Sequence, residues 1–376
     1  MNPFRKDRAL LAGLFVVLVI GIVMLSSASS ILGFDKFHDS YYYVKRQLVY
    51  GILPGIVLAS AVFWLTPTAL RRLAMPLYAG SVLLLVLVFI PGIGESLDRA
   101  RRWIRFGEVL LQPSELAKIA SILFAARWLS DQPAQALSDW KRGILPYLGF
   151  IALTGGLVIL EPDMGTTLVI TTTLFSLLFF AGAPIKKLLL VGGIGIIVAM
   201  VLVVSSSYRL ERLKTFIDGS DDPQGSSYHV NQALVGVSSG GWFGRGLGRS
   251  VQKLQYLPEV TSDSLFAIMA EELGFFRIAP VVVLLFWIIL RVLRMASRAH
   301  DPFSQLACAG IAVWLVVQSS INIGANVGLL PFTGVPLPFL SHGGTSMMVL
   351  ITSIAIALVL GGARIEGTHG SRGARI

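Results

Sequence analysis

The run LLAGLFVVLVIGIVML at residues 10–25 contains no charged side chain, and apolar residues continue beyond it. An apolar stretch of about 18 residues or more is typical of a helix that crosses a bilayer. Three basic residues, Arg5, Lys6 and Arg8, precede the run. A secretory signal begins in the same way, but its apolar core is shorter, about 7 to 15 residues. We therefore expect a first membrane span that is retained.

The whole chain has the composition of a protein with many such spans. Of its 376 residues, 54% are hydrophobic and 14% are charged, and the mean hydropathy is +0.73. Soluble proteins carry about 25% charged residues. The only cysteine, Cys308, lies in an apolar run and has no partner for a disulfide within the chain. This composition excludes a disordered chain, a disulfide scaffold and a nucleic-acid-binding module, and we expect no nucleic-acid partner.

Nine further apolar segments, together with the first, predict an all-α polytopic membrane protein with about ten transmembrane helices. The fourth segment is the weakest, because it holds Glu115, Lys118 and Arg127, and its loss would reverse the topology of everything after it. We treat residues 1–376 as one membrane domain, with a large outer loop between helices 7 and 8 at about 206–262 and a short cytoplasmic tail at about 363–376. The nine segments are 48–64, 73–91, 114–128, 143–160, 164–182, 185–205, 264–290, 305–328 and 338–362.

The net charge of +10 divides into two groups of basic residues. With the N-terminus inside, many of them lie in cytoplasmic segments, as the positive-inside bias predicts. The outer loops 92–112 and 206–262 are exceptions, because both are rich in arginine. Basic residues on the outer side favour an anionic ligand there, although long loops also translocate largely regardless of charge. No internal repeat is visible, which argues against a transporter built from repeats.

The first polar constellation consists of the runs RRWIRFG at 101–107 and QPSELAK at 112–118. Glu115 and Lys118 are three residues apart, so they share a helix face and can form an ion pair inside the membrane. The alternative is that the pair only fixes helix packing. Trp103 is equally suited to be an interfacial anchor.

Two more polar runs stand near the outer side. The run EPDMGTT at 161–167 suits a helix start, and Asp163 is also a candidate carboxylate facing an outer cavity. The glycine-rich run GRGLG at 244–248 lacks the Gly-Lys-Ser/Thr ending of a nucleotide-binding loop. We interpret it as a turn that needs glycine, with Arg245 facing phosphate.

Asp263 directly precedes the eighth predicted span. It is a candidate helix N-cap, but apolar surroundings would raise its pKa towards the value that a general base requires near neutral pH. Glu271 follows eight residues later and is placed to line the same cavity. The histidines have no zinc-ligand spacing, and no Gly-x-Ser-x-Gly motif of a serine hydrolase occurs.

Together, these motifs resemble the SEDS family, the FtsW/RodA membrane glycosyltransferases of bacterial cell-wall synthesis, over almost the whole chain. The run SVQKLQYLPE at 250–259 resembles the division branch, FtsW, more than the elongation branch, RodA. The chain departs from the family at TSDS (261–264), where members commonly have His-Thr-Asp-Phe, at His342, where they have tyrosine, and at Gln255, which is often acidic. The matching runs are RW (102–103), QPSELAK (112–118), EPDMGT (161–166), GRGLG (244–248), LPE (257–259) with Asp263, PLPF (336–339) and SHGGTS (341–346).

The resemblance implies ten transmembrane helices in the inner membrane, with both termini cytoplasmic, at the division septum. It implies a polymerase of lipid II in which Asp263 is the general base of an inverting transfer. The partners implied are a class B penicillin-binding protein transpeptidase and other division proteins. A lipid II flippase, a RodA-type elongation polymerase and a scaffold for partner enzymes are the alternatives.

The resemblance also implies a set of substrate-binding residues. Because pyrophosphate leaves readily, cationic stabilisation by Arg102, Arg212 or Lys118, or by a divalent cation (Mg or Mn), could replace an acid catalyst. No metal-ligand residues and no other cofactor are predicted. The substrate-binding candidates are Arg101, Arg102, Trp103, Glu115, Lys118, Asp163, Arg212, Arg245 and Glu259.

Overall fold

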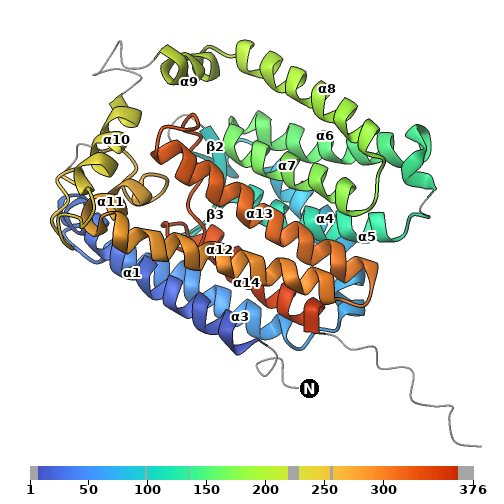
Figure 1. Ribbon diagram of the computed structural model, residues 1–376, viewed down its shortest axis with the longest axis horizontal. Coiled ribbons are helices and arrows are strands. Elements are labelled where there is room, and N and C mark those ends of the chain that lie inside the picture. Colours follow the sequence, from blue (N-terminus) through green and yellow to red (C-terminus); the bar gives the residue numbers. More distant parts are fainter. Residues whose placement is uncertain (1–6, 98–99, 134, 219–227, 255–256, 363–376) are drawn as a thin grey trace, which may run out of the picture.

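The computed structural model describes residues 7–97, 100–133, 135–218, 228–254 and 257–362. The predicted tail at 363–376 and parts of the predicted outer loop, 219–227 and 255–256, lie outside the described residues. The chain is mostly helical, with one small sheet (Figure 1). The helices are α1 (Arg8–Phe37), α2 (Tyr42–Gln47), η2 (Leu48–Ile52), α3 (Leu53–Val62), α4 (Pro67–Leu87), α5 (Pro113–Ser130), η3 (Ala136–Ser138), η4 (Trp140–Ile144), α6 (Leu145–Leu160), α7 (Met164–Phe180), α8 (Ile185–Val204), α9 (Ser207–Asp218), α10 (Tyr228–Gly240), α11 (Leu265–Leu273), α12 (Phe275–Arg298), α13 (Pro302–Asn326) and α14 (Gly344–Gly362).

Short polar side chains start several of the long helices. Asp7 accepts a hydrogen bond from the backbone N–H of Leu10 at the start of α1, and Asp301 accepts one from Ser304 at the start of α13, both at 2.9 Å. Each cap satisfies a backbone donor that has no partner within the helix. Asp7 and Asp301, which directly precede apolar runs in the sequence, therefore define where these two helices begin.

Within the described residues, seven helices are long and apolar enough to cross a membrane: α1, α4, η4 with α6, α8, α12, α13 and α14. The apolar helix α7 is slightly shorter, with 17 residues. The helices α2, η2 and α3 follow one another without a break from Tyr42 to Val62, and α5 carries Glu115, Lys118 and Arg127. The predicted helical, multi-pass membrane architecture is confirmed, while the number of ten spans stays a prediction.

Two predicted spans differ from the structure. The span expected at 264–290 is divided at Gly274 into a short buried helix, α11, and the longer α12. The span expected at 338–362 begins only at Gly344. The preceding segment contains Pro331, Pro336 and Pro338, which have no backbone N–H to donate to a helix.

The segment 92–112, expected as a loop, contains a three-stranded antiparallel sheet of β1 (Gly94–Leu97), β2 (Ala100–Phe106) and β3 (Val109–Leu111). Trp103 pairs with Glu95, and Arg105 pairs with Leu110. Arg105 also binds the Glu95 carboxylate at 2.6 Å. The arginine-rich run is therefore held in a defined shape before α5 begins.

The C-terminal helices α13 and α14 form the centre of the molecule. Of the most apolar stretch of each, 72% is buried, against 17% for α8. α13 packs against α5, α7, α12 and α14, whereas α8 runs along the edge (Figure 1). The polar residues of α13 consequently lie among other helices.

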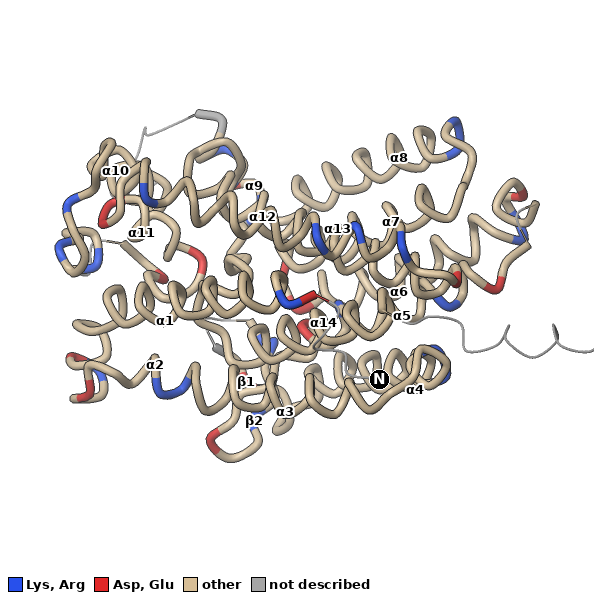
Figure 2. Tube along the Cα trace, turned by 60° about the horizontal axis from the view of Figure 1, so that its bottom comes forward, with Lys and Arg blue, Asp and Glu red and all other residues tan. Residues whose placement is uncertain are grey.

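The helix connections gather at two opposite ends. At one end, Arg71 pairs with Asp131, and Lys187 donates to the Ser138 carbonyl. The other end carries the sheet, α9, α10 and α11, and basic residues gather where α10 and α11 lie (Figure 2). Both predicted arginine-bearing outer loops therefore lie at the same end.

Candidate active site

Asp263 is fixed in place by its backbone. Its carbonyl oxygen accepts hydrogen bonds from the side-chain amides of Asn322 and Asn326 on α13, both at 2.8 Å. The residue is 7% exposed. Ser264, and not Asp263, precedes the first turn of α11, and it makes no side-chain capping bond. The helix-cap interpretation of Asp263 is therefore not supported, because its carboxylate does not cap α11.

The electrostatic surroundings of Asp263 favour its protonated form. Burial raises the pKa of its carboxyl to about 7, and the negative charge of Glu259 acts in the same direction. Arg212 and the Ser264 hydroxyl oppose this rise in pKa. The carboxyl thus changes charge close to neutral pH, as a general base does.

Glu259 lies beside Asp263. The Ser262 hydroxyl donates to Glu259 at 2.9 Å and lies 3.5 Å from the Asp263 carboxylate. Glu259 is exposed and adopts a positive φ of 50°. Two carboxylates therefore face the same hydroxyl at this end of the molecule.

Residues 331–338, PFTGVPLP, form neither helix nor strand, and we name them the proline segment. Several of the predicted site residues lie against this segment. Arg212 donates to the Phe332 carbonyl at 3.1 Å. A Cβ added to Gly334 would lie 3.8 Å from the Asp263 carboxylate, so the backbone passes close to it. Asn322 donates to the Val335 carbonyl at 2.8 Å. The proline segment and Asp263 are thus held by the same asparagine.

Arg102 reaches from β2 to the connection between α6 and α7. Its Nε donates to the Glu161 carbonyl at 2.9 Å, and its Nη2 donates to the Pro162 carbonyl. Asp163 caps α7 by accepting from Thr166 at 2.9 Å, which confirms the helix-start interpretation of that run. Gly165 lies against Thr333 and Val335, where an added Cβ would come within 2.6 Å of the Thr333 carbonyl oxygen. Arg102 and Asp163 therefore lie next to the proline segment.

Glu161 is a buried carboxyl that the sequence did not single out. It is 0% exposed, and neither of its carboxylate oxygens has a hydrogen-bond partner among the described residues. Burial raises the pKa of Glu161 to about 9, with Asp163 adding to the rise and Arg102 opposing it. The group is therefore neutral at pH 7.

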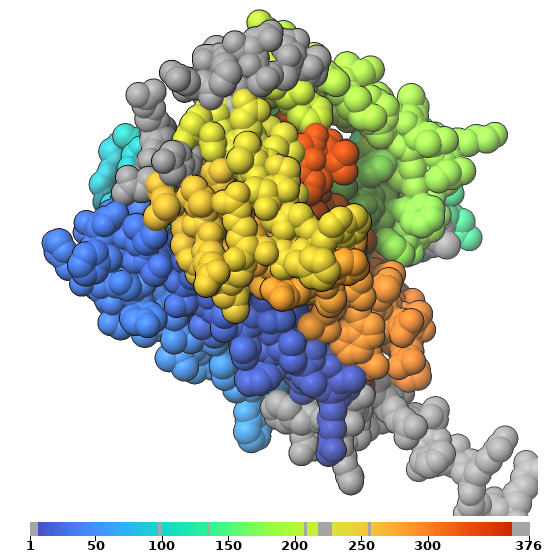
Figure 3. All heavy atoms as spheres, turned by 60° about the vertical axis from the view of Figure 1, so that its left-hand side comes forward, coloured from blue at the N-terminus to red at the C-terminus, as the bar shows by residue number. Residues whose placement is uncertain are grey.

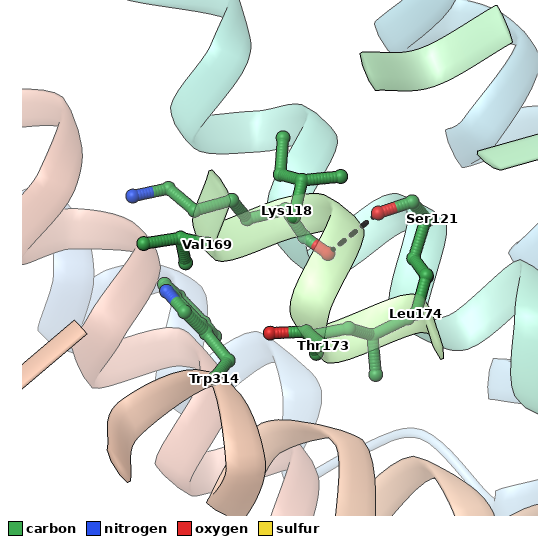
Figure 4. Close-up of a pocket in the computed structure, with 8 residues that line it drawn as sticks. Lys118, Ser121, Val169, Thr173, Leu174 and Trp314 are labelled. Atoms are coloured by element: carbon green, nitrogen blue, oxygen red, sulfur yellow. Dashed lines mark hydrogen bonds between the residues drawn. The ribbon is translucent and has the colours of Figure 1, made fainter. Parts of the chain in front are cut away.

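Glu115 and Lys118 form the predicted ion pair, at 2.8 Å and almost fully buried. Lys118 also contacts Gln318 at 3.2 Å, and Gln318 donates to the Pro336 carbonyl at 2.9 Å. In Figure 4, Lys118 from α5 and Trp314 from α13 line one small internal cavity. The buried pair is therefore linked to the proline segment through Gln318, and neither side chain lies at the protein surface.

The remaining predicted residues are more scattered. Arg101 is exposed on β2, and Trp103 is half-buried on the same strand. Arg245 pairs with Glu271 at 3.2 Å, and Glu271 also accepts bonds from Ser250 and from the backbone of Val251. Glu271 therefore holds the 245–252 turn, instead of lining a cavity with Asp263 as expected.

Asn322, Asn326 and His229 are functional candidates that the sequence interpretation missed. Gln318, Asn322 and Asn326 recur every four residues in an apolar span and so share one helix face, which was the available signal. His229 on α10 lies 2.6 Å from the Ser264 hydroxyl, and burial lowers its pKa to about 4. Its proximity to Asp263 could not be read from the sequence.

Among the residues that the structure describes, no group of three or more His, Cys, Asp or Glu side chains is arranged to hold a metal ion. Any cation at this site would need further oxygen ligands from a substrate.

The sequence profile of the family described as "Cell cycle protein", which comprises FtsW, RodA and SpoVE, matches residues 8–363. The chain belongs to this FtsW/RodA/SpoVE family. A probable peptidoglycan glycosyltransferase FtsW of Legionella pneumophila is 38% identical over 94% of this chain and 90% of its own length. The stage V sporulation protein E of Bacillus subtilis, another member of the family, is 37% identical over 91% of this chain and 93% of its own length.

Solved structures of the FtsW/RodA/SpoVE family share the fold. A chain from a structure on the coordination of polymerisation and crosslinking by a peptidoglycan synthase complex superimposes with a TM-score of 0.79 and 27% identity, covering 96% of this chain and 99% of that one. The Thermus thermophilus rod shape determining protein RodA gives a TM-score of 0.71 at 26% identity, covering 96% and 98%. The helical fold of the family thus extends over nearly the whole chain.

Proposed function

We propose that this protein is a peptidoglycan glycosyltransferase that polymerises lipid II, the undecaprenyl-pyrophosphate-linked disaccharide-pentapeptide. One observation carries the proposal: in a member of this family, a buried aspartate with a pKa of about 7, Asp263, lies at the end of the molecule where Arg102 and Arg212 also lie. A base and cations at one membrane face suit a reaction between a sugar hydroxyl and a pyrophosphate-linked sugar.

In the proposed reaction, the Asp263 carboxylate takes the proton from the 4-hydroxyl of the acceptor sugar. The hydroxyl oxygen attacks the anomeric carbon of the donor, and the bond from that carbon to the pyrophosphate oxygen breaks, with inversion at the carbon. The electron pair of the broken bond leaves on undecaprenyl pyrophosphate. Pyrophosphate needs no proton to depart, so cationic side chains take the place of the second carboxyl of inverting hydrolases.

Arg102 and Arg212 are the proposed cations for the leaving group. Arg212 donates to the Phe332 carbonyl in the proline segment, and its charge acts on Asp263. Arg102 is held at the same end of the molecule by the Glu161 and Pro162 carbonyls. A divalent cation such as Mg²⁺ or Mn²⁺ would be held by the exposed Glu259 carboxylate and by pyrophosphate oxygens, and would neutralise the departing charge.

The other candidate residues divide by burial. We assign Arg101, Trp103 and Arg245, which are exposed or half-buried, to contacts with the glycan or headgroup of lipid II. Asp163 is buried and caps α7, so we assign it to holding the start of that helix and not to substrate contact. Glu115 and Lys118 are 2% exposed, and they act through Gln318 on the shape of the proline segment. They are therefore proposed as positioning residues.

We place the protein in the inner membrane with both termini cytoplasmic, at the division septum, beside a class B penicillin-binding protein transpeptidase and other division proteins. The likeness to a chain of a synthase complex that couples polymerisation to crosslinking supports such a partner. Relatives named FtsW are 33–38% identical, against 26% for the RodA structure, which favours the division branch over RodA-type elongation.

The deciding experiment uses the purified full chain with its cognate transpeptidase and compares wild type with Asp263→Ala on lipid II. Wild type should form glycan chains, and the variant should form none above background. A loss of at least about 100-fold is expected from removal of a general base. Equal polymerisation by both proteins would exclude Asp263 as the base.

The transporter alternative gives a different result in the same preparation. If neither protein polymerises lipid II, but wild type in liposomes scrambles labelled lipid II between leaflets, the flippase interpretation is correct. A scaffold would do neither, yet would raise the activity of the partner. The location of Asp263 and Arg102 at one end of the bundle argues for an enzyme, because alternating access places its substrate site near the membrane midplane.

A further inference from the structure

An exposed aromatic cluster lies away from Asp263, between the α10–α11 connection and α12. It consists of Trp242, Phe243, Phe275 and Phe276, whose exposed fractions are 63%, 69%, 56% and 55%. The ring centroids of Trp242 lie 5.5 Å from those of both Phe275 and Phe276. Exposed contiguous apolar surface of this kind marks contact with a partner or with a membrane.

The position of the aromatic cluster along the membrane normal follows from α12. Phe275 and Phe276 are the first two residues of this membrane-spanning helix, and only 33% of its most apolar stretch is buried within the protein. Two backbone hydrogen bonds, from Phe275 to the Gly241 carbonyl and from Phe276 to the Trp242 carbonyl, hold the loop at the same level. Trp and Tyr are enriched at this level, where hydrocarbon meets headgroups, and Phe accompanies Trp on the apolar face of interfacial helices.

Basic residues accompany the cluster. Arg245, Arg249 and Arg277 are exposed, with the first two in the adjoining turn and the third in the first turn of α12. Figure 2 shows basic residues at this end of the molecule, and in Figure 3 the loop lies on the surface beside α12. Leu247 is 59% exposed between Arg245 and Arg249. Apolar side chains flanked by arginine favour an interface with anionic headgroups over open water.

We propose that the aromatic cluster and the turn at 244–249 bind the outer-leaflet interface of the bilayer, with Arg249 and Arg277 on the headgroups of anionic phospholipids. This inference does not depend on the proposed reaction. The anchored turn is tied to α11 by hydrogen bonds from Arg245 and Gly246 to the Glu271 and Glu272 carbonyls. α11 begins two residues after Asp263. The lipid contact therefore fixes the depth of α11 and Asp263 relative to the membrane surface.

A fluorescence experiment on the full chain in vesicles tests the contact. Leu247→Cys is labelled with bimane, and Cys308 is buried and does not compete for the label. The vesicles contain phosphatidylglycerol and phosphatidylcholine brominated at either shallow or deep positions of the acyl chain. We expect loss of emission in the shallow-brominated lipid, a smaller loss in the deep one, and a blue shift relative to the labelled control Glu108→Cys in the β2–β3 turn.

The opposite outcome is equally defined. If the label at position 247 is unquenched at both depths and emits like the label at position 108, the surface does not contact lipid. If it then becomes shielded only when the transpeptidase partner is added, the cluster is a protein interface and the proposal is wrong.

A second pair of variants tests the preference for anionic lipid without disturbing the core. Phosphatidylglycerol should raise the Tm of the detergent-solubilised wild type, and the double variant Arg249→Gln with Arg277→Gln should lose that rise. Arg142 is an exposed arginine of η4, at the opposite end of the molecule, and Arg142→Gln should keep that rise. An equal rise in all three proteins would contradict a role for the arginines. No rise in wild type would also contradict the proposal.

Discussion

At the scale of single residues, the proton equilibrium of Asp263 is the most informative feature. A general base acts in its ionised form, and burial together with Glu259 raises the pKa of Asp263 to about 7. Polymerisation of lipid II should therefore rise with pH, with its midpoint near pH 7. Glu259→Gln removes a negative charge that raises this pKa, so the midpoint should move to lower pH. An identical profile for both proteins, measured by gel analysis of glycan chains, would contradict this assignment.

The same raised pKa predicts an effect on stability. The folded state holds the Asp263 proton more tightly than the unfolded state, so this carboxyl favours folding below its unfolded pKa of 3.8, and the benefit is lost as the pH rises through about 7. Asn cannot ionise. Asp263→Asn should consequently have a higher Tm than wild type at pH 8, and the gap should close at low pH, as measured by thermal unfolding in detergent. If Asp263→Asn is less stable than wild type at pH 8, the buried Asp263 charge does not destabilise the folded state.

The pair of Glu115 and Lys118 gives a prediction with a matched control. Lys118→Met leaves the Glu115 carboxylate buried without its cation, which costs about 3–5 kcal/mol. Arg142 and Asp139 have the same spacing of three residues, but their side chains are 85% and 47% exposed. Arg142→Met should change the free energy of unfolding by less than about 1 kcal/mol. If Lys118→Met and Arg142→Met lower the free energy of unfolding by similar amounts, burial does not make the Glu115–Lys118 pair more important for stability than an exposed pair.

Part of the site could be predicted from single residues. The helical spacing of Glu115 and Lys118 correctly predicted their ion pair. Asp263 was noticed because it stands beside an apolar run, and its role as general base stays a prediction. Glu161 could not be recognised, because its lack of hydrogen-bond partners depends on helices that lie far away in the sequence. For Asp163, the local helix-start interpretation was the correct one.

At the scale of elements, Gly274 explains why the eighth apolar segment is not one helix. It has φ +72°, and a Cβ there would lie 2.1 Å from the backbone nitrogen of Gly244. Gly274→Ala should destabilise the protein by at least about 2 kcal/mol, because both the backbone and the contact would have to change.

Gly193 in α8 is the control for this substitution, since nothing lies within 4 Å of its added Cβ. Gly193→Ala should leave the Tm unchanged or raise it. If Gly274→Ala unfolds at the same temperature as wild type in a thermal scan, α11 and α12 are not held apart by this contact.

The limits of sequence interpretation at this scale have a physical cause. Ten apolar segments were visible because membrane helices are chosen by composition, and the long apolar helices overlap those segments. The helices α9 and α10 lie in the predicted outer loop, where hydropathy gives no signal for them. The break at Gly274 depends on a close approach by Gly244, and the sheet at 94–111 depends on cross-strand pairing. A hydropathy pattern records neither a close backbone approach nor strand pairing, so neither feature could be predicted from it.

At the scale of the whole molecule, the two ends of the bundle predict opposite access from the aqueous phases. Cysteine at Ser238 in α10 should react with a membrane-impermeant maleimide in intact spheroplasts, because this end is expected outside. Cysteine at Gln135, between α5 and η4, should react only after the membrane is permeabilised. Buried Cys308 should give no background. Labelling of position 135 in sealed spheroplasts would reverse the assigned orientation.

The contrast between α8 and α13 also bears on which inherited changes this protein can survive. Only 17% of the most apolar stretch of α8 is buried, so nearly any lipid-soluble side chain satisfies most of its positions. On α13, Gln318, Asn322 and Asn326 each hold a carbonyl or a cation by a specific amide, and no apolar replacement does so. In a saturation library selected for growth, α8 should accumulate neutral variation, while those three positions should remain almost invariant.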